Sequence, residues 1–250
     1  MSSRGDVGVN LAHEWTTADY RRLARPQDLV SYELCVQQTN MRVSTETNLS
    51  AQALALLLEA RTQIEGYIAH HPQFLRSLTP LPNDNGAPSV AAAMLDAAQR
   101  ARVGPMAAVA GAIAEFVGRG LAVTSREVIV ENGGDLYLQS HQPRELTLLA
   151  ENTAVGGIRI TVPAAPQGIG IATSAGTLGH SLSFGKADAV MVVAESSVLA
   201  DALATAIGNL VQGERDLATA IAHAQAMGAC AAVIVADAHI AAWGDIKLTA

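Results

Sequence analysis

The sequence contains few lysines and few aromatic residues, and both shortages exclude a class of protein. Lys186 and Lys247 are the only lysines, arginine supplies the remaining positive charge, and the formal net charge is −7. Nucleic-acid binding needs a basic surface for phosphates and aromatic side chains for base stacking. An acidic chain with 4% aromatic residues has neither, so we do not expect nucleic acid as a partner.

Cysteine is scarce and long apolar runs are missing. Cys35 and Cys230 lie far apart, match no zinc or thioredoxin spacing, and are interpreted as small hydrophobic residues in a reducing compartment. The first 14 residues are polar and lack the apolar core of a signal peptide. The longest apolar stretch, 228–236, is too short to cross a bilayer. These features predict a cytoplasmic protein that does not enter a membrane.

Composition indicates a folded chain, because half of the 250 residues are apolar and 16% are charged. We expect one domain over 1–250, with a possible internal division at the Pro- and Asn-rich loop near 79–88. Helices and strands are grouped rather than strictly alternating, which predicts an α+β fold. Helical periodicity marks 50–71, 89–102, 105–118, 198–211 and 215–227. Short β-branched runs mark strands at 30–37, 42–46, 128–130, 136–138, 146–149, 158–162, 190–193, 231–235 and 240–248, the last with a hairpin turn at 243–245.

Three segments contain residue types that suit a ligand site. The first is Asn132-Gly133-Gly134-Asp135, between two predicted strands. One interpretation is a plain hairpin turn, since Asn-Gly favours that structure. The other is a ligand site in which two glycines allow close approach and exposed amides bind an anion. The pattern alone leaves both open.

The second segment is Thr173-Ser174-Ala175-Gly176, with His180 following closely. Hydroxyl groups among glycines, in a stretch without carboxylates, suit a phosphate or pyrophosphate bound by hydrogen bonds. The alternative is a glycine-rich surface loop. His180 by itself is an ordinary histidine or a proton carrier.

The third segment contains Asp201 and Thr205, one turn apart on a predicted helix. Periodicity favours a solvated polar face. That face, however, carries no Lys, Arg or Glu, and a carboxylate beside a hydroxyl suits a hard cation such as Mg²⁺. A magnesium site at Asp201 and Thr205 is therefore the competing interpretation.

Taken together, these segments resemble the ApbE family of flavin transferases, and still more the UPF0280 family, an ApbE-like relative. The matching segments are Tyr67-Ile68, His71-Pro72, VGPMAAVAGAIAE (103–115), VENGGD (130–135), TSAGTLGHSLSFGKAD (173–188) and ADALATAIGN (200–209). The resemblance implies an ApbE-like, T-fold-related arrangement of layered helices and mixed or antiparallel sheets.

The resemblance also implies a function, because ApbE enzymes bind FAD and Mg²⁺ and transfer FMN to a Thr or Ser of a partner protein. It implies Mg²⁺ at Asp201 and Thr205 and a proton-transferring role for His180. It places FAD or another phosphate-bearing nucleotide at residues of the two glycine-containing segments, which are Asn132, Gly133, Gly134, Asp135, Thr173, Ser174 and Gly176.

Two departures from ApbE suggest a second hypothesis. The 109–115 segment has no lysine, and no Pro-x-Thr-Gly follows His180. The chain would then be a non-enzymatic accessory protein of sulfide incorporation into homocysteine, a process with which UPF0280 members are associated.

Overall fold

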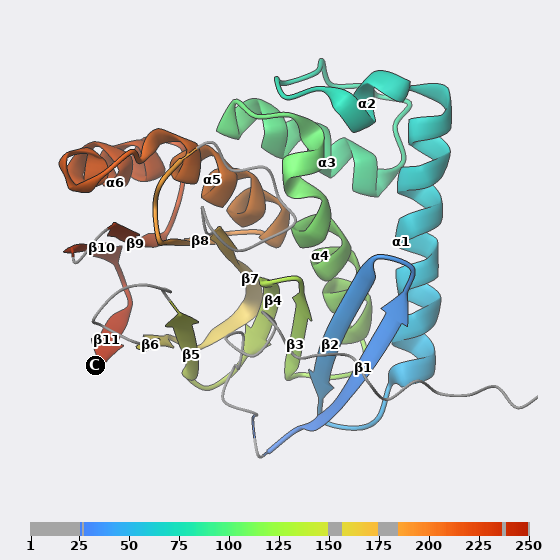
Figure 1. Cartoon of the computed structure of the whole chain (residues 1–250). Helices are drawn as coiled ribbons and strands as arrows, with labels where there is room; N and C mark the ends of the chain where they lie inside the picture. The colour runs from blue at the N-terminus through green and yellow to red at the C-terminus, as the bar shows by residue number, and fades with distance from the viewer. Residues whose placement is uncertain (1–25, 27, 150–156, 175–184, 237–238, 250) are drawn as a thin grey trace, which may run out of the picture.

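The computed structural model describes residues 26, 28–149, 157–174, 185–236 and 239–249. Within these ranges the chain forms a large and a small β-sheet, with helices on the outer face of the large sheet (Figure 1). The α+β fold expected from the sequence is confirmed, and all neighbouring strands among the described residues are antiparallel.

The large sheet has the strand order β1-β2-β3-β4-β7-β8-β9-β10, and the small sheet has the order β11-β6-β5. The strands of the large sheet are β1 (Val30–Val36), β2 (Thr39–Thr45), β3 (Val128–Asn132), β4 (Asp135–Ser140), β7 (Ala165–Ser174), β8 (Ala189–Ala194), β9 (Ala231–Ala236) and β10 (His239–Gly244). The strands of the small sheet are β5 (Arg144–Leu149), β6 (Gly157–Val162) and β11 (Lys247–Thr249).

The helices follow the apolar periodicity of the sequence. They are α1 (Ser50–His70), α2 (Pro72–Arg76), α3 (Ser89–Ala101), η1 (Pro105–Ala108), α4 (Val109–Ala122), α5 (Ser197–Leu210), η2 (Glu214–Asp216) and α6 (Leu217–Ala226). Among the described residues, no single helix is both long and apolar enough to cross a membrane, and α3 with η1 and α4 would qualify only as a pair bent by 105°.

Two hydrophobic cores lie on opposite faces of the large sheet. The core on the helical face includes Leu57, Met94, Val117 and Leu203. The core on the other face joins the large sheet to the small one and includes Leu138 and Ile160, together with Leu136, Leu146, Leu148, Ile158, Ile171, Met191 and Val233. Burial on both faces explains why β8 and β9 read as continuous apolar runs in the sequence.

The large sheet divides into two similar halves that meet in its middle. In the first half, the helices from α1 to α4 connect β1 and β2 to β3 and β4, and in the second, α5 and α6 connect β7 and β8 to β9 and β10. The halves join where β4 pairs with β7 and where α4 packs on α5 (Figure 1). The described parts of the predicted site segments, 132–135, 173–174 and 201–205, lie at this junction.

The structure corrects one expectation from the sequence and refines another. The turn at 243–245 does not form a hairpin, because β10 pairs with β9 while β11 pairs with β6 of the small sheet. The helix predicted at 198–211 begins one residue earlier, because Ser196 caps α5: its Oγ accepts a hydrogen bond from the amide of Leu199. Thr173 and Ser174 are the last residues of strand β7, and the rest of that segment, from residue 175 to residue 184, lies outside the described residues, so both interpretations of it stay open.

Candidate functional site

The Asn132–Asp135 segment is a β-hairpin turn between β3 and β4. Asn132 pairs with Asp135, and φ is +65° at Gly133 and +106° at Gly134, as a type I′ turn requires. The hairpin interpretation is therefore confirmed. The Asn132 side chain is buried and points to the helical layer, where its Nδ2 donates a hydrogen bond to the Ala110 carbonyl oxygen over 3.0 Å.

The end of β7 lies beside this turn. The Thr173 hydroxyl donates a hydrogen bond to the Gly134 carbonyl oxygen over 3.2 Å, so this side chain holds the hairpin in place. Ser174, the last residue of β7, is buried. Gly176 and His180 lie outside the described residues, and so their positions relative to the turn stay predictions.

Asp201 contacts the first turn of the neighbouring helix α4. Its Oδ2 accepts a hydrogen bond from the Gly111 amide over 2.9 Å, and the amide of Ala110 also donates to the carboxylate. The carboxylate thus lies at the positive end of the α4 dipole. This contact requires close helix packing, because a Cβ atom at Gly111 would lie 2.8 Å from the Asp201 Cβ.

Burial raises the pKa of Asp201 to about 7, although the amides of Gly111 and Ala110 act in the opposite direction. The desolvation cost of the charged form therefore exceeds the stabilisation that two amide donors provide. A carboxylate in this condition gains from a further positive charge nearby.

Thr205 lies one turn after Asp201 on α5, and both residues are partly exposed. The polar face does not continue as a solvated stripe, because Gly208 is buried and its carbonyl oxygen would lie 1.7 Å from a Cβ atom at Gly185. The described residues contain no group of three or more His, Cys, Asp or Glu side chains that could hold a metal. A cation bound here would therefore need other oxygen ligands besides the Asp201 carboxylate.

The start of α4 is the part of this site that motif spacing did not identify. Ala110 receives the Asn132 hydrogen bond on its carbonyl oxygen, and the amides of Ala110 and Gly111 donate to Asp201. The structure thus brings the hairpin, β7 and α5 together around one helical turn. The small residues of α4 allow close approach by another backbone, as Gly111 does at the Ser197 carbonyl group of α5.

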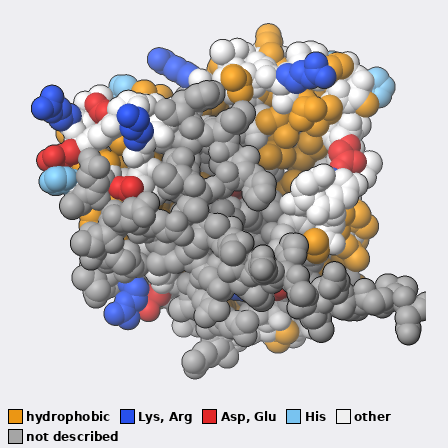
Figure 2. All heavy atoms as spheres, viewed as in Figure 1, with side chains coloured by type: hydrophobic (Ala, Val, Ile, Leu, Met, Phe, Trp, Pro, Cys, Tyr) orange, Lys and Arg blue, Asp and Glu red, His pale blue; other side chains and the backbone are white. Residues whose placement is uncertain are grey.

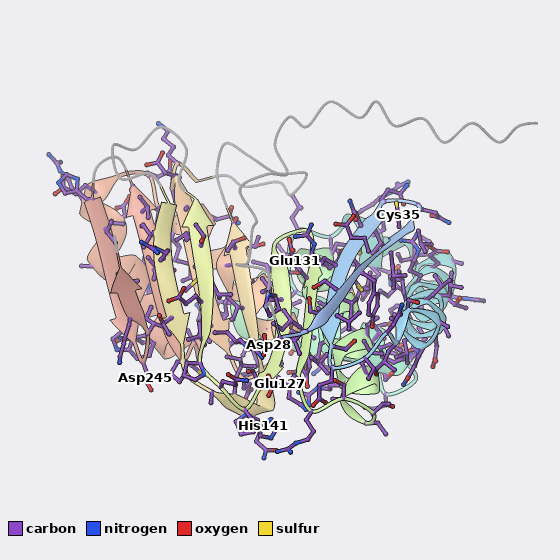
Figure 3. The ribbon with its side chains drawn as sticks, turned by 90° about the horizontal axis from the view of Figure 1, so that it is seen from below. Asp28, Cys35, Glu127, Glu131, His141 and Asp245 are labelled. Atoms are coloured by element: carbon purple, nitrogen blue, oxygen red, sulfur yellow. The ribbon has the colours of Figure 1, made fainter. Side chains whose placement is uncertain are left out.

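A second polar cluster lies near the opposite end of β3. Arg144 forms ion pairs with Asp28 at 2.9 Å and with Glu127 at 2.7 Å, and Glu127 also accepts hydrogen bonds from Ser140 and His141. Figure 3 shows Asp28, Glu127 and His141 gathered at this end, away from Glu131. Because these contacts join the start of β1 to β3 and β5, we interpret the cluster as structural.

On the face of the molecule in Figure 2, hydrophobic side chains gather over the region where Figure 1 places α1 and α3. Large apolar side chains are exposed at the start of α1 and around α2, among them Leu54, Leu58, Leu75 and Leu78. Nothing within the described residues covers them, and we assign them no function.

Comparison with known proteins gives one consistent match. A family model described as AbpE bacteria matches residues 21–241. Among curated proteins, the UPF0280 protein of Methanococcus vannielii is 37% identical over 194 residues, which cover 76% of this chain and 78% of the relative. The UPF0280 protein of Methanococcus aeolicus is 36% identical over 193 residues, which cover 75% and 78%, respectively.

Two solved structures have a similar fold at low sequence identity. The ApbE protein of Thermotoga maritima superposes with a TM-score of 0.57 at 14% identity, over 85% of this chain and 96% of that chain. The flavin transferase ApbE of Vibrio cholerae gives a TM-score of 0.55 at 13% identity, over 86% and 96%. At this level of identity the likeness shows the fold, and the ApbE-like fold expected from the sequence is confirmed.

Proposed function

Because this chain belongs to the UPF0280 family and has the fold of ApbE flavin transferases, we propose that it binds FAD together with Mg²⁺ and transfers FMN to a hydroxyl group of a protein partner. In such a transfer the hydroxyl oxygen attacks the FMN phosphorus, the pyrophosphate bond of FAD breaks, and AMP leaves. The proton of the hydroxyl goes to a base, for which His180 is the candidate that the family resemblance suggests.

The position of Asp201 is the observation that supports this proposal most. Its carboxylate is held at the first turn of α4, and the same turn binds Asn132 of the glycine-containing hairpin. An ionised carboxylate has about four lone-pair positions, and among the described residues two backbone amides use them. The remaining positions leave room for a cation.

The residues present fit magnesium by their chemistry. Asp201 supplies a carboxylate, Thr205 supplies a hydroxyl, and Mg²⁺ prefers oxygen ligands while retaining waters or phosphate oxygens in its other positions. The high pKa of Asp201 fits as well, because a bound cation would offset the cost of the buried negative charge. When bound, the metal supplies a positive charge that neutralises the phosphates.

The hairpin would bind the phosphate-bearing part of the ligand. Gly133 is exposed and has no side chain, so that a ligand can reach the backbone of the turn. Thr173 keeps the turn in place through the Gly134 carbonyl oxygen. In this proposal Asn132 and Thr173 therefore support the turn, while Gly133, Gly134, Asp135 and Ser174 face the ligand, with Gly176 expected near it from the sequence.

Titration of the protein with FAD in the presence and absence of Mg²⁺ tests the proposal. We expect saturable quenching of flavin fluorescence that depends on Mg²⁺, and release of AMP when a hydroxyl acceptor is supplied. Asp201→Asn should weaken the Mg²⁺-dependent binding at least tenfold, or about 1.4 kcal/mol, while the amide oxygen still caps α4. The matched control is Asp96→Asn, because Asp96 is exposed on α3.

The outcomes separate a ligand residue from a structural one. If Asp201→Asn binds FAD and Mg²⁺ as the wild type does, Asp201 serves only as a cap for α4. The absence of flavin binding at high micromolar FAD would instead exclude the FAD form of the proposal.

The missing lysine of the 109–115 segment and the missing Pro-x-Thr-Gly after His180 favour a second candidate. In it the fold and the phosphate site persist without transfer, and the protein is an accessory factor of sulfide incorporation into homocysteine. It predicts FAD or nucleotide binding without AMP release for any hydroxyl acceptor. Slow release of AMP that is lost in Asp201→Asn would contradict it.

A further inference from the structure

Glu115 is a buried acidic residue on α4 to which the sequence and the family resemblance assign no role. It is 8% exposed, and both of its carboxylate oxygens have partners. Oε2 accepts hydrogen bonds from the amides of Ser197, at 2.7 Å, and Val198, at 3.3 Å, which are the first two residues of α5. Oε1 accepts a hydrogen bond from the Arg119 guanidinium at 2.7 Å.

The contact between Glu115 and α5 is mirrored by the contact between Asp201 and α4. Asp201 accepts hydrogen bonds from two amides in the first turn of α4, and Glu115 accepts them from two amides in the first turn of α5. Each helix therefore supplies the carboxylate that caps the other helix. We call these four residue contacts, of Glu115 with Ser197 and Val198 and of Asp201 with Ala110 and Gly111, the reciprocal cap.

The start of α5 has little freedom to move without disturbing the reciprocal cap. The buried Ser197 hydroxyl donates a hydrogen bond to the Leu136 carbonyl oxygen at 2.8 Å. A Cβ atom at Gly170 of β7 would lie 2.2 Å from the Ser197 amide nitrogen, and one at Gly111 would lie 2.1 Å from the Ser197 carbonyl oxygen. The first turn of α5 thus rests directly on the backbones of β7 and α4.

We propose that Glu115 is a positioning residue for the proposed cation site at Asp201 and Thr205. By holding the first turn of α5 against α4, Glu115 fixes the position of the Asp201 carboxylate, which lies one turn later on α5. The effect of Glu115 on cation binding rests on the proposed function. The effect of Glu115 on the position of Asp201, in contrast, can be measured in the protein without any ligand. Glu115 does not touch the ligand in this scheme and acts through α5 alone.

The coupling can be measured without any ligand by hydrogen exchange of individual amides, followed by NMR. Glu115→Ala should lower the protection of the Gly111 amide about tenfold more than that of α1 amides such as Leu57, since local opening of one helix contact raises exchange there first. The Gly111 amide donates its hydrogen bond to Asp201, whereas the Glu115 side chain is bonded to Arg119 and to the start of α5. Faster exchange of the Gly111 amide therefore reports a displacement of Asp201.

Two conservative variants distinguish geometry from charge. Glu115→Gln retains length and an acceptor oxygen, and Arg119 is exposed enough to turn away, so Gly111 protection should recover. Glu115→Asp retains charge but is one methylene shorter, so it should behave like Glu115→Ala. If Glu115→Asp restored the protection of the Gly111 amide and Glu115→Gln did not, the positioning role would be wrong, and the charge of Glu115 would act on the α5 dipole instead.

The cation arm uses Mg²⁺ with FAD as the probe. Glu115→Ala should raise the Mg²⁺ concentration needed for half-maximal flavin quenching about tenfold and leave Mg²⁺-independent flavin binding unchanged. Glu59→Ala, at an exposed site on α1, is the control. Unchanged Gly111 exchange in Glu115→Ala and Glu115→Asp would refute the inference, whereas a wild type that binds neither Mg²⁺ nor FAD would refute only the proposed function.

Discussion

Replacing Gly111 by alanine tests whether the close contact of α4 and α5 forms the site. The new Cβ atom would lie 2.1 Å from the Ser197 carbonyl oxygen, where ordinary contact begins at 3.4 Å, so the helices must separate by about 1.3 Å. The two nearest atoms, O and C of Ser197, belong to the backbone and cannot turn aside. The separation also stretches the 2.9 Å hydrogen bond from the Gly111 amide to Asp201.

The expected loss of stability combines three effects. Alanine gains about 0.5–1 kcal/mol over glycine inside a helix. Overpacking a core costs about 1–3 kcal/mol, and a hydrogen bond to a charged group contributes about 1.5–3 kcal/mol. Gly111→Ala should therefore lower the free energy of unfolding by about 2–5 kcal/mol.

Gly66 provides a matched control for this measurement. It also lies inside a helix, α1, but is exposed, and no atom would lie within 4 Å of an added Cβ. Gly66→Ala should raise the free energy of unfolding by about 0.5–1 kcal/mol, as helix propensity requires. Urea denaturation of both variants gives the comparison, with equal m-values as the condition for interpreting it. Equal stabilities of Gly111→Ala and Gly66→Ala would refute the close packing on which the site depends.

Two further predictions concern the surroundings of the site. Hydrogen bonds from Ser140 and Arg144 lower the pKa of Glu127 even though burial acts to raise it, so its contribution to stability is present above about pH 4.5 and disappears as the pH falls through its lowered pKa. The stability difference between wild type and Glu127→Gln, measured by urea denaturation, should thus shrink below that pH; a constant difference would contradict it. Thr173→Val leaves the Gly134 carbonyl oxygen without its donor and should cost about 1 kcal/mol, with faster amide exchange confined to the hairpin. Unchanged exchange there would show that Thr173 does not hold the turn.

Local patterns predicted those elements whose causes are local. The type I′ turn follows from two adjacent glycines after asparagine, and α3 follows from its apolar periodicity. Other features have causes outside their own segments. Gly170 lies within β7, where the absence of a side chain leaves room for the first turn of α5, a helix that follows 27 residues later. The small strand β11 pairs with β6, far away in the sequence, which no local signal could have indicated.

The site was predicted only in part for the same reason. Asp201 and Asn132 were chosen as candidates because their residue types and spacing suit ligand binding, and the structure places both against the first turn of α4. The first turn of α4 was not chosen, since backbone amides of Ala110 and Gly111 have no chemical signature in a sequence. Glu115 was visible as the only acidic residue of an apolar helix, but its partners are amides of another helix, 82 residues later for Ser197. Packing of α4 on α5 alone creates that contact.

Capping of α4 and the proposed cation binding are compatible roles for Asp201. If Asp201 served only as a cap, a neutral side chain such as asparagine would cap α4 equally well. It would avoid the desolvation cost of a buried charge, which raises the pKa of Asp201 to about 7. The chain instead keeps a carboxylate there, one turn before Thr205 and against the turn that contacts Asn132. In the proposed function a bound cation would offset this desolvation cost, so Mg²⁺ should stabilise the wild type at pH 8 and leave Asp201→Asn unaffected in thermal unfolding. Equal stabilisation of both proteins would place any bound Mg²⁺ elsewhere in the molecule.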